Sequence, residues 1–320
     1  MTITALAAGP ARTMRAGDTA PGRWPAGGHF GAWRAVVMLP AIIGGLLLMS
    51  ALTAGFGACE TPTFLLWLAG AAVVSTRWGE RLAVRTAYRF RPLSDWEGQL
   101  LEPVFEAALA RCDRPSSELD WYVQPGRQPN ASVAGRHSVA VTDGALASFL
   151  AGRLPADLFS AVLIHELGHH ATGATRFALA AGWLAAPGRL AFQVVLRLAV
   201  LTSGGQRPGR ANCVVVAVGG AIAIAQAVQQ QHWTSTAMLA GIAAALLATP
   251  LLDSAVSRAS DHTADRYATA IGAGPDLARA LAMIGGAGGH QQRRGWSNRL
   301  LDRHPNLDDR LARLTGASTV

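Results

Sequence analysis

The chain has 320 residues, half of them hydrophobic and only 15% charged, and its formal net charge is +8. The apolar residues gather in long runs, which is the profile of a membrane protein. All of the positive charge is arginine, and the arginines flank the apolar runs, which favours membrane orientation and disfavours a nucleic-acid partner. Three cysteines without a C-x-x-C pair disfavour both a disulfide framework and a cysteine metal site.

Residues 1–32 are rich in Ala, Gly, Pro and Arg and predict a disordered cytoplasmic tail. An uncharged run over residues 35–54 is long enough to cross a bilayer, and a shorter run over residues 62–76 predicts the second arm of a transmembrane hairpin. Arginines precede and follow this hairpin, whereas its turn carries Glu60 and no arginine, so both ends are expected in the cytoplasm. Because the second run is short, a buried hairpin of a soluble protein is the alternative.

The next stretch mixes helical and strand patterns. Ser94-Asp95-Trp96-Glu97 is a capping box that predicts a helix to about Cys112, and Pro155 predicts the start of another helix. Between them we expect a strand over 119–123, a Gly/Pro/Asn-rich loop over 124–136, an alternating strand over 138–142 and a short helix over 144–152. These patterns predict a small α+β domain.

A second apolar region follows this domain. Residues 177–201 are interrupted by Arg189 and Arg197, which favours an amphipathic helix that lies against the membrane or closes over a functional site. Residues 211–227 and 236–252 are uncharged and predict a second hairpin, whose connection has no arginine and therefore faces outside. The sequence thus predicts four transmembrane helices.

The segment Ala161–His170 contains an H-E-x-x-H motif at the end of an apolar run that predicts a helix. Because positions i and i+4 share a helix face, His165 and His169 can bind one metal ion. Glu166 lies beside that metal, where a carboxylate can take a proton from a bound water. A pair of surface histidines without a ligand is the alternative, and His170, turned about 100° from its neighbour, needs no function.

A catalytic zinc ion needs a third protein ligand. No glutamate follows Glu166, so a later carboxylate ligand must be an aspartate. The helical run Ser257–Ala268 puts Asp261 and Asp265 on one face, which suits one aspartate on the metal and the other hydrogen-bonded to a ligand histidine. A solvated acidic helix face is the alternative, and His262 is a rival ligand.

Four separated blocks resemble the HtpX-type membrane-bound zinc metallopeptidases, the gluzincin family that also contains the CAAX prenyl endopeptidases. The blocks are Pro129-Asn130-Ala131 with Gly135-Arg136 and Val139 to Gly144, then Ala161 to His169, then Ser257-Arg258 with Asp261, Ala264 and Asp265, and finally His304-Pro305 with Arg310 to Leu314. Their order, their spacing and the membrane layout agree with the family. One departure is Asp261, because the family has a glutamate there. Aspartate is one methylene shorter, so its helix must approach the metal by about one ångström.

The resemblance implies a mainly α-helical membrane protein with a small zincin-like α+β catalytic domain and one zinc ion per chain. It implies that His165, His169 and Asp261 hold the zinc and that Asp265 orients a ligand histidine. Glu166 would be the general base that activates water.

The resemblance also implies how a polypeptide substrate is held. Strand 139–142 is expected as the sheet edge that pairs with the substrate backbone. Asn130 would hold substrate backbone, while His304 and Arg310 would stabilise the tetrahedral oxyanion. The alternative for His304 and Arg310 is helix capping and a surface charge.

The expected organisation follows the membrane layout. Its parts are a tail (1–32), a transmembrane hairpin (33–76), a zincin-like catalytic part (77–175), an amphipathic helix and linker (176–210), a second transmembrane hairpin (211–252) and a part with the third ligand and C-terminal catalytic residues (253–320). We expect a multi-pass plasma-membrane endopeptidase that cleaves membrane or misfolded proteins, with its N-terminus and catalytic domain in the cytoplasm. The alternatives are a catalytically impaired membrane adaptor and a signalling metallopeptidase that cuts a specific regulator.

Overall fold

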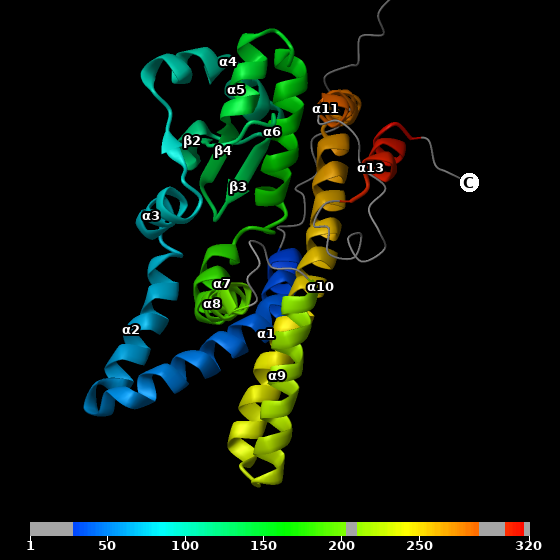
Figure 1. The fold of residues 1–320 in the computed structure, drawn as a ribbon. Helices are drawn as coiled ribbons and strands as arrows, with labels where there is room; N and C mark the ends of the chain where they lie inside the picture. The colour runs from blue at the N-terminus through cyan, green and yellow to red at the C-terminus, as the bar shows by residue number, and fades with distance from the viewer. Residues whose placement is uncertain (1–27, 203–209, 288–304, 317–320) are drawn as a thin grey trace, which may run out of the picture.

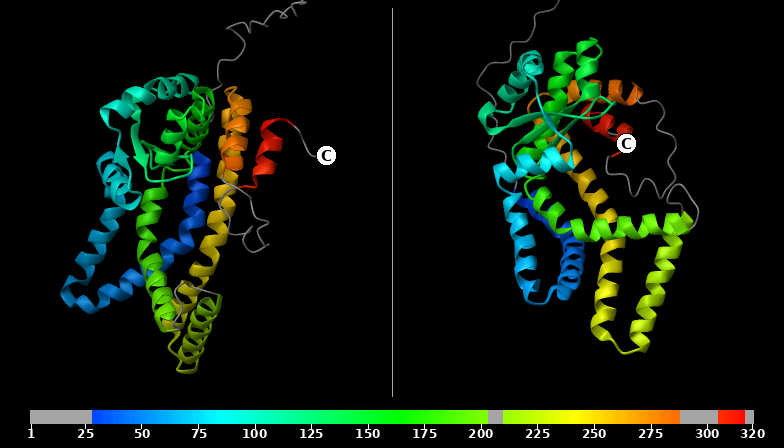
Figure 2. Two further views of the ribbon diagram at one scale, coloured as in Figure 1. Left: turned by 45° about the horizontal axis from the view of Figure 1, so that its top comes forward. Right: turned by 60° about the vertical axis from the view of Figure 1, so that its left-hand side comes forward.

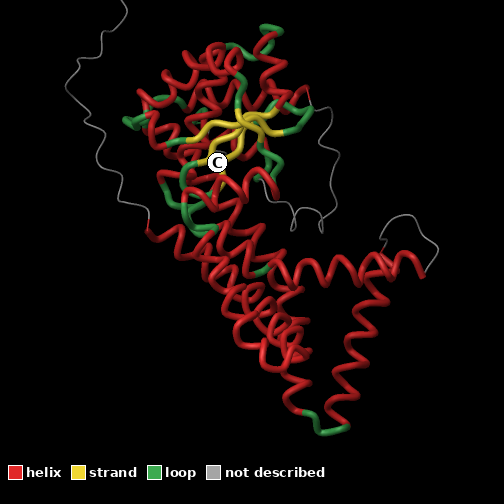
Figure 3. Tube along the Cα trace, turned by 90° about the vertical axis from the view of Figure 1, so that its left-hand side faces the viewer, coloured by secondary structure: helices red, strands yellow, loops and turns green. Residues whose placement is uncertain are grey.

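The structure is a computed structural model that describes residues 28–202, 210–287 and 305–316. It is mainly helical with one small mixed sheet, as the sequence predicts. The strands lie together in one lobe, and long helices extend away from it (Figures 1 and 3). In chain order the elements are α1 (Gly28–Thr53), η1 (Ala54–Cys59), α2 (Glu60–Val73), α3 (Arg77–Ala87), β1 (Arg91–Pro92), α4 (Asp95–Arg111), η2 (Ser116–Glu118), β2 (Asp120–Gln124), β3 (Ala131–Ala134), β4 (Ser138–Thr142), α5 (Asp143–Leu150), α6 (Ala156–Ala171), α7 (Ala178–Leu184), α8 (Ala186–Thr202), α9 (Arg210–Gln229), α10 (Trp233–Ala270), α11 (Gly274–Ala287) and α13 (Leu307–Leu314).

The sheet has the strand order β1-β2-β4-β3. β2 and β4 are parallel, whereas β3 runs antiparallel to β4, with Val133 opposite Val139. β4 is therefore an interior strand, so the expectation that residues 139–142 form the free edge is wrong, and β3 is the edge strand on that side. The loop expected over 124–136 is wrong at the same place, because β3 lies within it.

A buried carboxylate from α3 holds the turn between β3 and β4. Glu80 accepts hydrogen bonds from the backbone N–H groups of Arg136 and His137, at 2.9 and 2.8 Å, and from the Ser138 hydroxyl at 2.7 Å. Gly135 has a φ of +63°, and a Cβ at this position would collide with the Glu80 carboxyl group. Strand β3 therefore depends on a contact between segments 56 residues apart, which no local pattern could predict.

Helices α4 and α6 pack on one face of the sheet and form its main core. The predicted capping box begins α4, since the backbone N–H of Ser94 donates to Glu97 Oε2 at 2.8 Å. Phe159, Leu163 and Leu101 are among the largest fully buried side chains of this core. Because α6 lies in the centre of the core, its backbone is held firmly by packing. The side chains on its exposed face therefore start from fixed positions.

The first helical hairpin contains the stretch Val36–Val73, whose 38 residues are long and apolar enough to cross a membrane. This stretch folds back on itself through η1, and α1 and α2 diverge from that turn (Figure 1), with α7 in contact with both. Within the described ranges no other stretch meets that criterion, and Ala217–Gln229 is a shorter apolar helix. Four transmembrane helices therefore stay a prediction.

The tail expected over residues 1–32 is partly wrong, because α1 begins at Gly28 and includes its last five residues. The apolar helix extends in the N-terminal direction beyond the uncharged run. Residues 1–27 lie outside the described ranges.

Residues 177–201 form two helices, α7 and α8, instead of the single amphipathic helix expected. Pro187 lies in the first turn of α8, where a missing N–H is tolerated, but it cannot continue a helix from α7. α8 runs across the hairpin formed by α9 and α10 (Figure 2). α10 is a continuous helix of 38 residues, which joins the last predicted span to the run that carries Asp261 and Asp265.

Candidate metal centre

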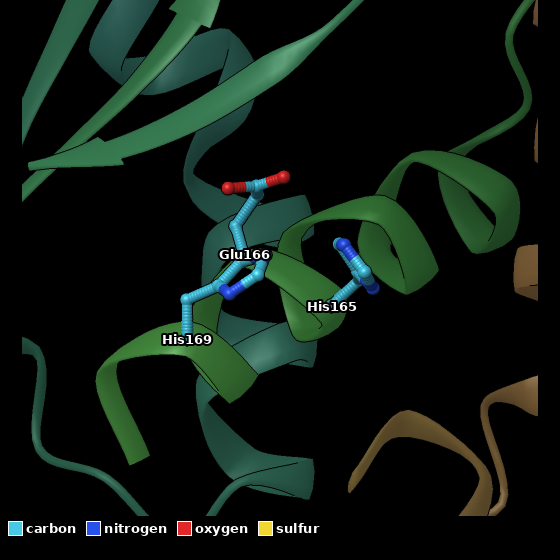
Figure 4. Close-up of side chains that lie close together, drawn as sticks. All are labelled: His165, Glu166 and His169. Atoms are coloured by element: carbon cyan, nitrogen blue, oxygen red, sulfur yellow. The ribbon is translucent and has the colours of Figure 1, made fainter. Parts of the chain in front are cut away.

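The H-E-x-x-H segment lies in α6, which begins after Pro155 and carries Asp157 in its first turn. His165 and His169 are 6% and 9% exposed, and their ring centroids lie 5.0 Å apart with the rings nearly perpendicular. Potential ligand atoms of both histidines and of Glu166 lie within 4.8 Å of one another. Figure 4 shows Glu166 reaching from α6 toward the strands, and its side chain lines one cleft together with His165 and His169.

The ring of His169 is held between two consecutive residues of α10. Its Nε2 lies 3.4 Å from Asp261 Oδ1, and its Nδ1 lies 2.9 Å from Ser260 Oγ. Asp261 and Ser260 are both buried. The expected ligand Asp261 therefore lies on the Nε2 side of a ligand histidine, which is the side that a metal would share with it.

The ring of His165 is backed by a buried ion pair. Its Nδ1 lies 2.9 Å from Asp265 Oδ1, while Arg310 donates to both oxygens of Asp265 at 2.7 and 2.9 Å. Burial raises the pKa of Asp265, but the contacts with His165 and Arg310 outweigh it and lower this pKa to about 2. Asp265 is therefore a charged group directly beside the His165 ring, and its role in orienting that ring stays a prediction.

These residues fit a zinc ion. Zinc takes imidazole nitrogen and carboxylate oxygen as ligands, and tetrahedral bonds of about 2.0–2.2 Å put neighbouring ligand atoms about 3.4 Å apart. The distance between His169 Nε2 and Asp261 Oδ1 equals that value, at 3.4 Å. Because Nδ1 of His165 and of His169 lies 2.9 Å from a protein side chain, Nε2 would be the ligand atom of each ring.

Glu166 has the properties of a proton acceptor. Burial raises its pKa, although the nearby histidines His169 and His165 act in the opposite direction. A carboxylate with a raised pKa is a stronger base, and general bases act best when their pKa approaches the working pH. Glu166 therefore suits proton transfer better than it suits a ligand role.

The centre opens into a cleft of about 840 Å³. The cleft is bordered by β3, by the preceding loop that ends at Asn130, and by Leu281 and Ile284 of α11. Asn130 is exposed, and its backbone N–H donates to Thr142 Oγ1 at 2.9 Å. Arg310 also borders the cleft, and its Nη2 lies 3.5 Å from His165 Nε2. His304, the other residue expected here, lies outside the described ranges.

Two contributors to the site were not expected from the sequence. One is the edge strand β3, whose pairing depends on Glu80 and β4. The other is Ser260, a serine inside a helix, which carries no pattern of its own. Its position directly before Asp261 gave no signal either, because successive residues of a helix point about 100° apart and do not face each other.

An H-E-x-x-H helix, a carboxylate from a later helix and a strand edge along the cleft define a zincin-type metallopeptidase. The family model of peptidase family M48 matches residues 95–318, and the chain belongs to this family of zinc metallopeptidases, which confirms the family expected from the sequence. No curated protein matches the chain. Among solved structures, the crystal structure of S. mikatae Ste24p is similar, with a TM-score of 0.45 and 19% identity. That similarity covers 83% of this chain and 65% of the other, so the chain spans less than two thirds of that protein.

Proposed function

We propose that the protein is an integral membrane, zinc-dependent endopeptidase that hydrolyses peptide bonds of membrane or misfolded proteins at a cytoplasmic-side site. The observation that carries this proposal is the geometry around His169, where Asp261 lies at the spacing of two ligands on one metal. Membership of peptidase family M48 supports the chemistry. One zinc ion would be held by His165 and His169, whose possible ligand atoms lie within 4.8 Å of each other, and by Asp261, which lies 3.4 Å from His169.

Zinc, when bound, supplies a Lewis acid that polarises the scissile carbonyl and lowers the pKa of water. Glu166 takes a proton from the attacking water and passes it to the leaving amine, which its raised pKa favours. Arg310 brings a buried positive charge beside His165, where it can stabilise the developing oxyanion. Its bidentate pair with Asp265 holds that charge in place.

The substrate would bind as an additional strand on β3. The Thr142 N–H donates to the Asn130 carbonyl at 2.9 Å, so these two residues form a hydrogen-bonded pair of the ladder. Such pairs alternate with non-hydrogen-bonded ones in an antiparallel ladder. Ala131 and Val133 therefore direct their N–H and C=O groups to the free edge, where an extended peptide can pair with them. Asn130, at the start of this edge, would hold the end of the same peptide backbone.

The membrane part of the proposal is supported by exposed apolar surface. The stretch Val36–Val73, which folds back as α1 and α2, contains an 18-residue window apolar enough for a membrane span. On α8, an exposed stripe recurs every three or four residues and consists of Leu190, Val194, Leu198 and Leu201. Arg197 lies at the border of this stripe, which is typical of a helix in the lipid interface. The arginines that flank the apolar runs favour a plasma-membrane protein with the catalytic lobe in the cytoplasm.

The test uses the full chain purified in detergent. We expect one zinc per chain and cleavage of casein, and we expect Glu166→Gln to keep its zinc while losing about 10²–10⁴-fold in rate, the contribution typical of a general base. Glu106→Gln, which changes an exposed glutamate of α4, is the matched control and should cleave like the wild type. A wild type that neither retains zinc nor cleaves casein would overturn the proposal.

A further inference from the structure

The two ligand histidines have different partners at Nδ1. His165 faces the carboxylate of Asp265 at 2.9 Å, whereas His169 faces the hydroxyl of Ser260 at the same distance. Ser260 is only 1% exposed, so water cannot easily take the place of this hydroxyl. The two histidines therefore differ in the partner of Nδ1, although their spacing on α6 does not require this difference.

A carboxylate and a hydroxyl allow different protonation patterns of a neutral imidazole. An ionised carboxylate only accepts hydrogen bonds, so Asp265 selects the tautomer of His165 with the proton on Nδ1. A serine hydroxyl both donates and accepts, so Ser260 can pair with either tautomer of His169. The surroundings of Nε2 therefore decide which tautomer His169 adopts, and this atom lies 3.4 Å from Asp261 Oδ1.

We propose that Ser260 is the positioning residue of His169 and that its reversible hydroxyl lets this ring change tautomer when zinc binds. Without metal, His169 carries its proton on Nε2, directed at Asp261, and the Ser260 hydroxyl donates to Nδ1. With metal, Nε2 becomes a ligand atom, the proton lies on Nδ1 and the Ser260 oxygen accepts it. His165 undergoes no such change, because Asp265 keeps its proton on Nδ1 in both states.

In this role Ser260 contributes to the zinc affinity of the site and not to the stability of the fold. Partners that orient a ligand histidine typically contribute 10–100-fold to metal affinity. Removing the hydroxyl should not prevent folding, because alanine is the best helix former and α10 is continuous through this position. The inference rests on the proposed zinc site and adds that Ser260 positions His169, the second histidine ligand.

The experiment measures zinc affinity of the metal-free full chain by competition with a chromophoric chelator, and in parallel the thermal unfolding of the metal-free protein. We expect Ser260→Ala to lower the affinity by about 10–100-fold, Ser260→Thr to restore most of it, and neither to change metal-free unfolding much. Thr263→Val is the matched control, since the Thr263 hydroxyl donates within its own helix, to the Ala259 carbonyl at 2.9 Å. It should bind zinc like the wild type.

Two measurements of zinc affinity would overturn the inference: Ser260→Ala with wild-type affinity, or Ser260→Thr as weak as Ser260→Ala. Either result leaves the proposed endopeptidase intact, because that proposal fails only where the wild type itself binds no zinc and cleaves nothing. A loss of affinity matched by an equal loss of metal-free stability would also count against the inference, since it would make Ser260 a packing residue.

Discussion

Helices α6 and α10 build the metal centre together, yet they are held in the protein in different ways. Every residue of α6 from Leu158 to His169 is buried except Glu166, so this helix is packed into the core over almost its whole length while His165, Glu166 and His169 line the cleft. α10 begins in the hairpin with α9, where Trp233 is exposed, and ends against α6, where Ala264 and Ala268 are fully buried.

The difference shows how each helix is positioned. α6 is positioned by contacts within the catalytic core alone. α10 is positioned by the core at one end and by contacts with α1 and α9 at the other. Since α10 supplies Ser260, Asp261 and Asp265, the metal centre is connected through one rigid helix to the hairpins proposed to lie in the membrane. Changes on α10 should therefore affect stability and metal affinity, whereas Glu166 on α6 should affect the rate.

The largest effect on stability is expected from Asp265→Asn. Asp265 and Arg310 are both buried, and loss of the carboxylate charge leaves the guanidinium without its counter-ion, which typically costs about 3–5 kcal/mol. Chemical denaturation of the metal-free chain in detergent would measure it. The control Asp276→Asn breaks the pairs with Arg279 and Arg111, whose side chains are 63% and 45% exposed, and should cost less than about 1 kcal/mol. Equal effects of the two substitutions would contradict the buried-pair argument.

The next effect concerns zinc affinity alone. Asp261→Ala removes a proposed zinc ligand. Loss of a residue that only orients a ligand lowers metal affinity by up to roughly 100-fold, so loss of the ligand itself should lower it further. Chelator competition on the purified chain measures this change. The matched variant is His262→Ala, at the neighbouring position, which should leave affinity unchanged. If His262→Ala lost zinc and Asp261→Ala kept it, the rival histidine would be the third ligand.

The same contrast explains what could be predicted from the sequence. The histidine pair on α6 and the capping box at Ser94 and Glu97 follow from spacing within one helix, and both are local. The prediction that Asp261 and Asp265 belong to the site also rests on local information, because it comes from their four-residue spacing on one helix. β3 was missed because four small or short residues become a strand only through β4 and Glu80, which is 56 residues from the turn it holds. The predicted edge was wrong for the same reason, since strand order depends on contacts distant in sequence.

The smallest effect is expected where α6 and α10 cross. A Cβ on Gly168 would lie 3.2 Å from Ala264 Cα and 3.1 Å from a ring carbon of Tyr267, so the two helices approach closely there. This approach favours the short side chain of Asp261 as a ligand. Gly168→Ala gains about 0.5–1 kcal/mol of helix propensity but adds overpacking of about 1–3 kcal/mol, so a net loss of about 1 kcal/mol is expected.

The sign of the change in the free energy of unfolding tests whether α6 and α10 are in close contact at Gly168. Gly98 lies in α4, and a Cβ added there would have no neighbouring atom within 4 Å, so Gly98→Ala should stabilise the chain by about 0.5–1 kcal/mol. Denaturant midpoints of the two variants, measured side by side, should therefore move in opposite directions. Because the added methyl group pushes α10 away from α6, Gly168→Ala should also weaken zinc binding, whereas Gly98→Ala should not. Stabilisation by both substitutions would show that α10 has room at the crossing and that Asp261 reaches the site without a close helix contact.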